Sequence, residues 1–129
     1  MAVRIVRLGS KRAPREGLRI GTVRRPPRGV PKSRFAADDW YDVWFPTLAP
    51  SVPTMKLGLS AASDREWSAF DRKYRAEMKQ PDASRALDLL AALSRHSDFS
   101  VGCYCDDESR CHRGVLRKLL TERGATIVR

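Results

Sequence analysis

The chain has 129 residues, of which 42% are hydrophobic and 31% are charged. This length fits one domain with its own hydrophobic core, and no apolar run approaches the roughly 18 residues of a membrane span. Three cysteines, an odd number, argue against a disulfide framework and for a reducing compartment. Because no apolar stretch typical of a secretory signal stands near the N-terminus, we expect a cytoplasmic protein.

The net charge of +10 is concentrated in the first 36 residues. This segment has eleven Lys or Arg against one acid, Glu16, which gives +10, whereas residues 37–129 have fourteen charges of each sign. A basic patch of this kind attracts phosphates through a salt-sensitive field that does not depend on sequence. Such a patch is necessary but not sufficient for nucleic-acid binding, and it is the basis of an alternative function, a non-enzymatic nucleic-acid-binding or interaction module.

The first third of the chain alternates short apolar runs with polar loops. Residues 3–8 and 18–23 predict two strands. Residues 24–32 contain three prolines and predict a stiff loop at a strand end that displays Arg24, Arg25 and Arg28. Four aromatic side chains follow and are interpreted mainly as core: Trp40, Tyr41, Trp44 and Phe45. Residues 46–53 predict irregular structure.

The middle of the chain predicts two helices. Ser63 and Glu66 form a capping box that marks the start of the first. Its buried face is expected to consist of Trp67, Phe70, Tyr74 and Met78. Pro81 ends this helix. Asp82 is predicted to cap the second, which ends near His96 and turns inward Ala86, Leu87, Leu90, Ala91 and Leu93.

Residues 99–104 predict a third strand and residues 125–128 a last short one. Between them a helix is predicted that is closed by Gly124 and has an apolar face of Val115, Leu116, Leu119 and Leu120. Strands that alternate with helices indicate an α/β fold. We expect one small domain over residues 1–129, of three layers, with a short, mainly parallel sheet, flanking helices and a basic N-terminal strand and loop at 1–17.

Residues 101–113 contain all three cysteines and one of the two histidines. Ligands bind at the carboxyl ends of parallel strands, so loops 24–29 and 105–113 are expected to converge on one crevice. Ser109 is predicted to cap the last helix. This cap would place Arg110, Cys111 and His112 in the first turn, where free amides favour an anion and lower the pKa of a thiol. Gly114 would allow a close approach of another element.

Three interpretations of this segment stay open. In the first, Cys111 is a reactive thiolate or anion-binding cysteine, His112 carries a proton, and Arg110 or Arg113 clamps a phosphate. In the second, a zinc ion is bound by Cys103, Cys105, Cys111 and His112, although this spacing departs from the usual two to four residues. In the third, Cys103 is a small buried hydrophobe, Cys105 is incidental, and residues 111–113 order the loop through hydrogen bonds.

The run Cys103-Tyr104-Cys105, the acidic loop after it, and Cys111-His112-Arg113 before an apolar helix resemble the domain of unknown function 488 family. The upstream part resembles its YeaO-like branch through Arg19-Ile20, Arg24, Pro27 to Lys32, Trp44, Pro50-Ser51, Phe70, Tyr74 and Glu77-Met78. The resemblance covers about residues 18 to 122. It implies a small cytosolic α/β protein, supplies no reaction, and points to a site of Arg24, Arg28, Cys111, His112 and Arg113.

The leading prediction is an anion site at the start of the last helix, lined by the loop from Arg24 to Arg28. Its ligand would be a phosphate-bearing molecule, either a nucleotide or nucleic acid, and no membrane partner is expected. The predicted roles are catalytic for Cys111 and His112, and anion-binding for Arg24, Arg28, Arg110 and Arg113. The basic-patch module is the alternative and a zinc-stabilised scaffold the third. The sequence identifies no cofactor.

Overall fold

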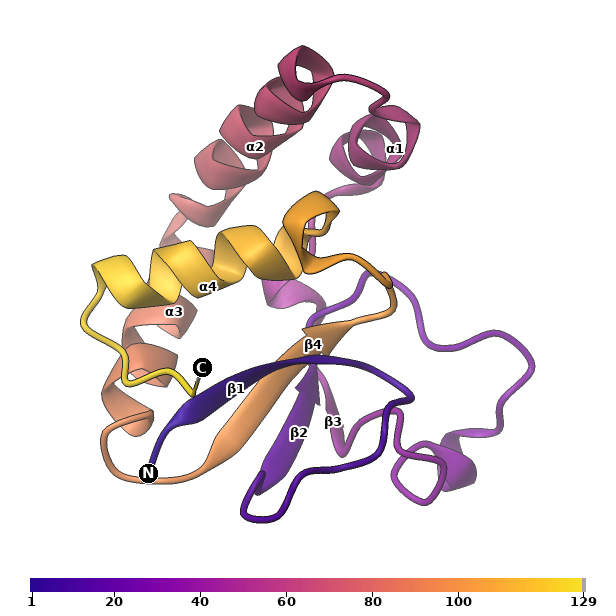
Figure 1. The fold of residues 1–129 in the computed structure, drawn as a ribbon, viewed down its shortest axis with the longest axis vertical. Helices are drawn as coiled ribbons and strands as arrows, with labels where there is room; N and C mark the ends of the chain where they lie inside the picture. The colour runs from indigo at the N-terminus through magenta and orange to yellow at the C-terminus, as the bar shows by residue number, and fades with distance from the viewer. Residues whose placement is uncertain (129) are drawn as a thin grey trace.

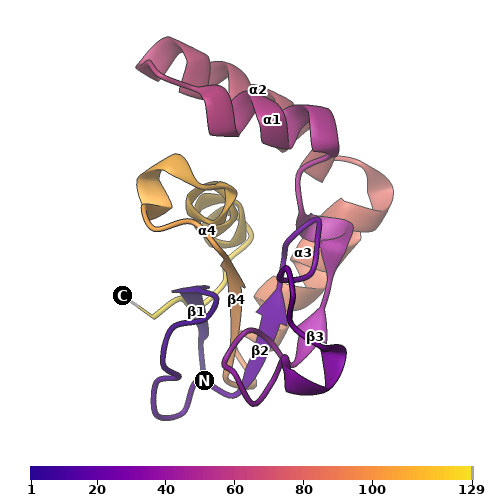
Figure 2. The ribbon, with the colours of Figure 1, turned by 90° about the vertical axis from the view of Figure 1, so that its right-hand side faces the viewer.

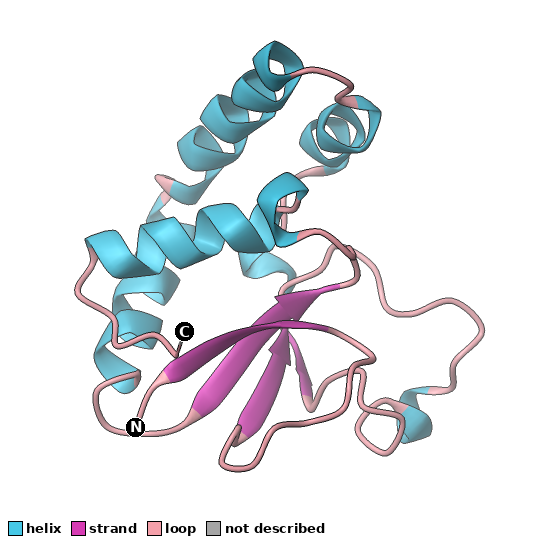
Figure 3. Cartoon of the chain, viewed as in Figure 1, coloured by secondary structure: helices cyan, strands magenta, loops and turns pink. Residues whose placement is uncertain are grey.

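The structure, a computed structural model, describes residues 1–128. Figures 1 and 3 show one sheet with helices packed around it. The strands are β1 (Val3–Arg7), β2 (Leu18–Gly21), β3 (Val43–Trp44) and β4 (Phe99–Cys103). The helices are α1 (Val52–Ser60), α2 (Asp64–Met78), α3 (Pro81–Leu93) and α4 (His112–Glu122), with short 3-10 turns η1 (Lys32–Arg34), η2 (Pro46–Leu48) and η3 (Glu108–Arg110).

The four strands pair in the order β1-β4-β2-β3, and every pairing is parallel. In the central register, Val101 of β4 lies between Ile5 of β1 and Ile20 of β2. Because the strands are parallel, the loops that follow β1, β2 and β4 all leave from the same edge of the sheet. The predicted α/β fold with a parallel sheet is confirmed.

The two faces of the sheet are covered differently. Side chains alternate between faces along a strand, and Val3, Ile20, Phe99 and Val101 pack into one core with buried side chains of α2, α3 and α4. Figure 1 shows α4 lying next to the sheet, above β1 and β4 in this view, and Figure 2 shows α1 and α2 standing farther from the sheet.

Loops cover the opposite face. A Cβ at Gly21 would lie 2.3 Å from the ring of Tyr41, so this ring sits directly on the strand. Leu8, Tyr41, Cys103 and Cys111 belong to a second buried cluster. The third layer of the domain is therefore built from loops.

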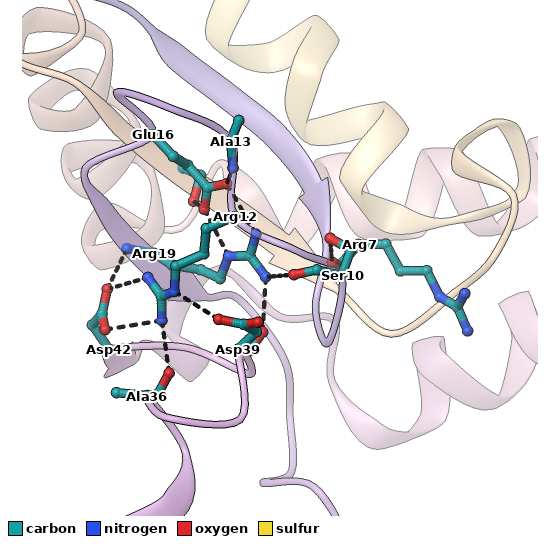
Figure 4. A network of polar contacts seen from close by, with 10 residues as sticks. Arg7, Ser10, Arg12, Ala13, Glu16, Arg19, Ala36, Asp39 and Asp42 are labelled. Carbon is teal, nitrogen blue, oxygen red and sulfur yellow. Dashed lines mark hydrogen bonds and ion pairs between the residues drawn. The ribbon is translucent and has the colours of Figure 1, made fainter.

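A buried ion pair anchors this loop layer (Figure 4). The Arg19 side chain is fully buried, and its Nε and Nη2 donate to the two carboxylate oxygens of Glu16 at 2.7 and 2.9 Å. The Ser100 hydroxyl and the Ala13 amide also donate to Glu16, at 2.8 and 3.1 Å. Burial raises the pKa of Glu16, but the hydrogen bonds from Arg19, Ala13 and Ser100 outweigh it and lower this pKa to about 2.

Several local predictions are confirmed. Ser63 caps α2 by accepting from the Glu66 amide at 3.2 Å. The predicted apolar faces of α2 and α4 are buried, except that Trp67 is partly exposed. Gly124 ends α4 with a φ of +79°, the left-handed conformation that a glycine adopts without strain.

Other local predictions were wrong. Residues 46–53 are not irregular, because η2 and the start of α1 lie there and Ser51 caps α1 through the Thr54 amide. Helix α3 begins at Pro81 after the cap residue Gln80, so Asp82 is not the cap. This start is favourable because a proline lacks the amide that a first helical position leaves unpaired.

Two further differences concern exposed or extended segments. Leu93, predicted to face inward, is 39% exposed at the end of α3. In place of a strand at 125–128, a single bridge pairs Ile127 with Val3. The chain there meets β1 at the edge of the sheet without forming a regular ladder.

Candidate functional site

A pocket of about 840 Å³ opens at the carboxyl edge of the sheet. Its walls come from the segments after β1, β2 and β4, from α1 and from the start of α4, so loops 24–29 and 105–113 meet as expected. Among residues 1–128, the lining includes four arginines and no Asp or Glu. The lining residues are Arg7, Leu8, Gly9, Ser10, Val23, Arg24, Arg25, Pro26, Pro27, Arg28, Trp40, Pro50, Met55, Leu59, Cys103, Tyr104, Cys105 and His112.

The proline-rich loop after β2 is held by its neighbours. The Arg24 guanidinium donates to the carbonyl oxygens of Pro50 and Ala49 at 3.1 and 3.0 Å. The Tyr104 hydroxyl donates to the Arg25 carbonyl at 2.8 Å. These bonds position the loop but leave the guanidinium groups of Arg25 and Arg28 without a hydrogen bond or ion pair among residues 1–128.

The start of α4 differs from the prediction. Cys111, not Ser109, is the cap residue, and His112 and Arg113 form the first turn. Ser109 lies one turn earlier because its amide and hydroxyl both donate to the Asp107 carboxylate, at 3.0 and 2.7 Å, within the η3 segment. The predicted close approach at Gly114 is confirmed, since a Cβ there would lie 2.4 Å from the Glu108 carbonyl oxygen.

Three thiols lie together at this helix start. Cys103 and Cys111 are buried, and Cys105 is half-buried and lines the pocket. Hydrogen bonds from the thiols of Cys103 and Cys111 lower the pKa of Cys105. The contact with Cys105 is the main cause that raises the pKa of Cys103, and the contacts with Cys103 and Cys105 raise the pKa of Cys111. The sequence led us to expect a lowered pKa at Cys111.

His112 is fixed in orientation between the pocket and the core. Its Nε2 lies 2.6 Å from the Thr22 carbonyl oxygen, and its ring packs edge-on against Tyr74, with centroids 5.6 Å apart. A carbonyl oxygen accepts hydrogen bonds, so Nε2 carries the proton of this contact. Burial lowers the pKa of His112, which favours the neutral imidazole with its lone pair on Nδ1.

The four arginines predicted to bind an anion do not converge. Arg24 and Arg28 line the pocket. Arg110 forms an ion pair with Asp64 and lies over the Trp67 ring, 5.7 Å from its centroid. Arg113 is only 5% exposed, and its Nη2 donates to the Asp106 carbonyl at 3.2 Å. Among residues 1–128, its Nε and Nη1 have no hydrogen-bond partner.

One group of side chains suited to a metal ion comes together within the part of the chain that the structure describes. One ligand atom each from Cys103, Cys111 and His112 lies within 4.8 Å of the others. The Cys105 sulfur is not part of this group, but the Cys105 amide donates to the Cys103 sulfur at 3.4 Å. His96, which we interpreted as a helix-end residue, is exposed beyond the end of α3.

Sequence reasoning did not assign several residues of the pocket wall to the site, among them Arg7, Trp40 and Tyr104. Arg7 and Tyr104 stand at the carboxyl ends of predicted strands, so the position rule for parallel sheets could have found them. Trp40 was interpreted as core, and its ring does pack edge-on against Tyr104, 5.9 Å between centroids. The density of large aromatic side chains at residues 40–45 also allowed a lid over a pocket, which fits the place of Trp40 in the pocket wall.

Comparison with known proteins places the chain in one family. A family model described as the active DUF488-N3 subclade matches residues 3–124. No curated protein and no solved structure matches the chain significantly. None of the helices within residues 1–128 has the length and apolar character needed to cross a membrane. The YeaO-like branch stays a prediction, but a match over nearly the whole chain shows that this protein belongs to the DUF488 family.

Proposed function

We propose that the pocket at the carboxyl edge of the sheet binds a phosphate-bearing small molecule. One observation carries this proposal: of the residues that the structure describes, four arginines and no Asp or Glu line the pocket. A cavity walled by charges of one sign raises the local concentration of ligands of the opposite sign. Guanidinium groups match phosphate oxygens with two parallel hydrogen bonds, which makes phosphate the favoured anion.

The four arginines of the pocket have different roles. Arg7 donates to the Tyr104 carbonyl and pairs with Asp106, and Arg24 binds two backbone carbonyls, so both are engaged in holding loops. Arg25 and Arg28 are exposed on the proline-rich loop. Because prolines stiffen this loop, its backbone loses little conformational freedom when these two side chains bind a phosphate.

The remaining wall accommodates an organic group. Trp40 and Tyr104 form an aromatic corner, and Met55 and Leu59 of α1 add apolar surface. The volume of about 840 Å³ is within the range of pockets for small organic ligands. The ligand is therefore a phosphate ester with an apolar or aromatic part, of which a nucleotide is one example. The catalytic roles of Cys111 and His112 stay predictions.

Calorimetric titration tests this proposal, with AMP, adenosine and inorganic phosphate as probes. We expect AMP to bind and adenosine to bind more weakly. Each charged hydrogen bond lost in Arg25→Ala or Arg28→Ala should weaken AMP binding by about tenfold or more. Arg72→Ala, an exposed arginine of α2 outside the pocket wall, is the matched control. Absence of AMP binding, or equal affinity in the double variant Arg25→Ala/Arg28→Ala, contradicts the proposal.

The basic-patch module has weaker support. Four of the eleven basic side chains in residues 1–36 form ion pairs with partners in the described part of the chain, namely Arg7, Arg12, Arg19 and Arg34. Arg19 is fully buried and contributes no surface. The positive electrostatic field that residues 1–36 present to a nucleic acid is therefore weaker than their net charge of +10 suggests. Oligonucleotide binding that is steeply salt-dependent and unaffected by Arg25→Ala/Arg28→Ala would favour this module over the phosphate pocket.

A further inference from the structure

We propose that Cys103, Cys105, Cys111 and His112 bind one zinc ion at the floor of the pocket. The ligand atoms of three of them lie within 4.8 Å of one another. In a tetrahedral site with zinc–sulfur bonds of about 2.3 Å, ligand atoms are roughly 3.8 Å apart. The observed group therefore needs shifts of about an ångström or less to close around an ion.

Cys105 completes the set of four. Cys105 lines the same pocket as Cys103 and His112. The Cys105 amide donates to the Cys103 sulfur at 3.4 Å, and this contact keeps the two residues close together. Three sulfurs and one imidazole are a donor set that zinc prefers, and hard cations such as magnesium bind such a set poorly.

The orientation of His112 fits metal binding. Its Nε2 donates to the Thr22 carbonyl at 2.6 Å, which leaves Nδ1 as the nitrogen with a lone pair. Histidines that bind metals commonly hold their other ring nitrogen on a backbone carbonyl, because this contact fixes both the tautomer and the plane of the ring. Thr22 follows β2, so the sheet itself orients the ligand.

Arg113 supplies an independent observation. Its guanidinium is buried, yet its Nε and Nη1 have no partner among residues 1–128. A buried cation is costly unless a negative group lies near it. A zinc ion with three thiolates and a neutral imidazole carries a net charge of −1, and Arg113 directly follows the His112 ligand. The amino-terminal end of α4 favours the same sign of charge.

Metal analysis tests this inference on the whole protein without any phosphate ligand, so its outcome is independent of the proposed pocket function. The protein purified without added metal is expected to contain one zinc per chain by mass spectrometry. After replacement by Co²⁺, we expect the thiolate-to-cobalt charge-transfer band and the intense visible bands of a tetrahedral site. Metal content far below one per chain with no such bands after Co²⁺ addition overturns the inference.

Two variants identify the ligands. Cys105→Ser changes the half-buried thiol and is expected to lower zinc affinity at least tenfold and to weaken the charge-transfer band. His96→Ala, which changes the exposed histidine, should leave both unchanged. An unaltered cobalt spectrum in Cys105→Ser overturns the four-ligand site. A third readout needs no variant: iodoacetamide should label the cysteines faster after zinc is chelated, and equal labelling rates before and after chelation contradict the inference.

Discussion

Glu16→Gln tests how the loop layer is held to the sheet. The variant keeps the shape of the side chain but removes the charge that faces Arg19, which is fully buried. Removing one partner of a buried pair costs about 3–5 kcal/mol, because the other charge is left without compensation. The pKa of Glu16, lowered from 4.5 to about 2, gives a similar figure of about 3 kcal/mol at neutral pH.

The pH dependence of the unfolding free energy is the most specific test of this prediction. The pKa of Glu16 is lower in the folded than in the unfolded state, so its stabilisation is complete above about pH 4.5 and is lost as the pH falls towards 2. The difference in unfolding free energy between the wild type and Glu16→Gln should therefore shrink by about 2 kcal/mol between about pH 7 and pH 3.

Urea unfolding followed by tryptophan fluorescence at several pH values measures this difference. Asp38→Asn is the control, because the exposed pair of Asp38 with Arg34 should contribute less than about 1 kcal/mol. A cost below about 1 kcal/mol for Glu16→Gln, or a cost that does not change between neutral and acidic pH, would refute the reasoning.

Two further predictions concern packing near the site. Tyr74→Phe removes the hydroxyl that donates to the Leu48 carbonyl at 2.6 Å in the core, and should lower the unfolding free energy by about 1–2 kcal/mol in urea titrations; an unchanged value would mean that the carbonyl finds another partner. Gly114→Ala places a Cβ against the Glu108 carbonyl oxygen and should cost about 1–3 kcal/mol. Wild-type stability in Gly114→Ala would contradict the close packing of η3 on α4.

The local pattern of the sequence determined much of the fold. The capping box at Ser63, the apolar faces of α2 and α4, and the strands β1, β2 and β4 are read from residues at most four positions apart. Such signals predict elements because helices and strands repeat over short intervals. Alternation of strands and helices then indicated the parallel sheet, and with it the edge at which the pocket lies.

Contacts between distant segments were decided only by the tertiary structure. Ser51, the cap of α1, is itself held by Glu77, 26 positions away, because its amide and hydroxyl donate to the Glu77 carboxylate at 2.8 and 2.6 Å. Glu16 is buried against Arg19 because Ser100 of β4 closes over it from 84 positions away. Sequence spacing predicts neither of these contacts, because each depends on how distant segments pack together in the fold.

The candidate site likewise depends partly on local sequence and partly on contacts between distant segments. The sequence singled out residues 101–113 from their composition, but the unusual spacing of Cys103, Cys105 and Cys111 argued against a shared ion. The fold brings the end of β4 and the start of α4 together, and the Thr22 carbonyl, 90 positions from His112, sets the orientation of its ring. Distances between side chains on different elements are fixed by packing, and sequence spacing alone does not determine them.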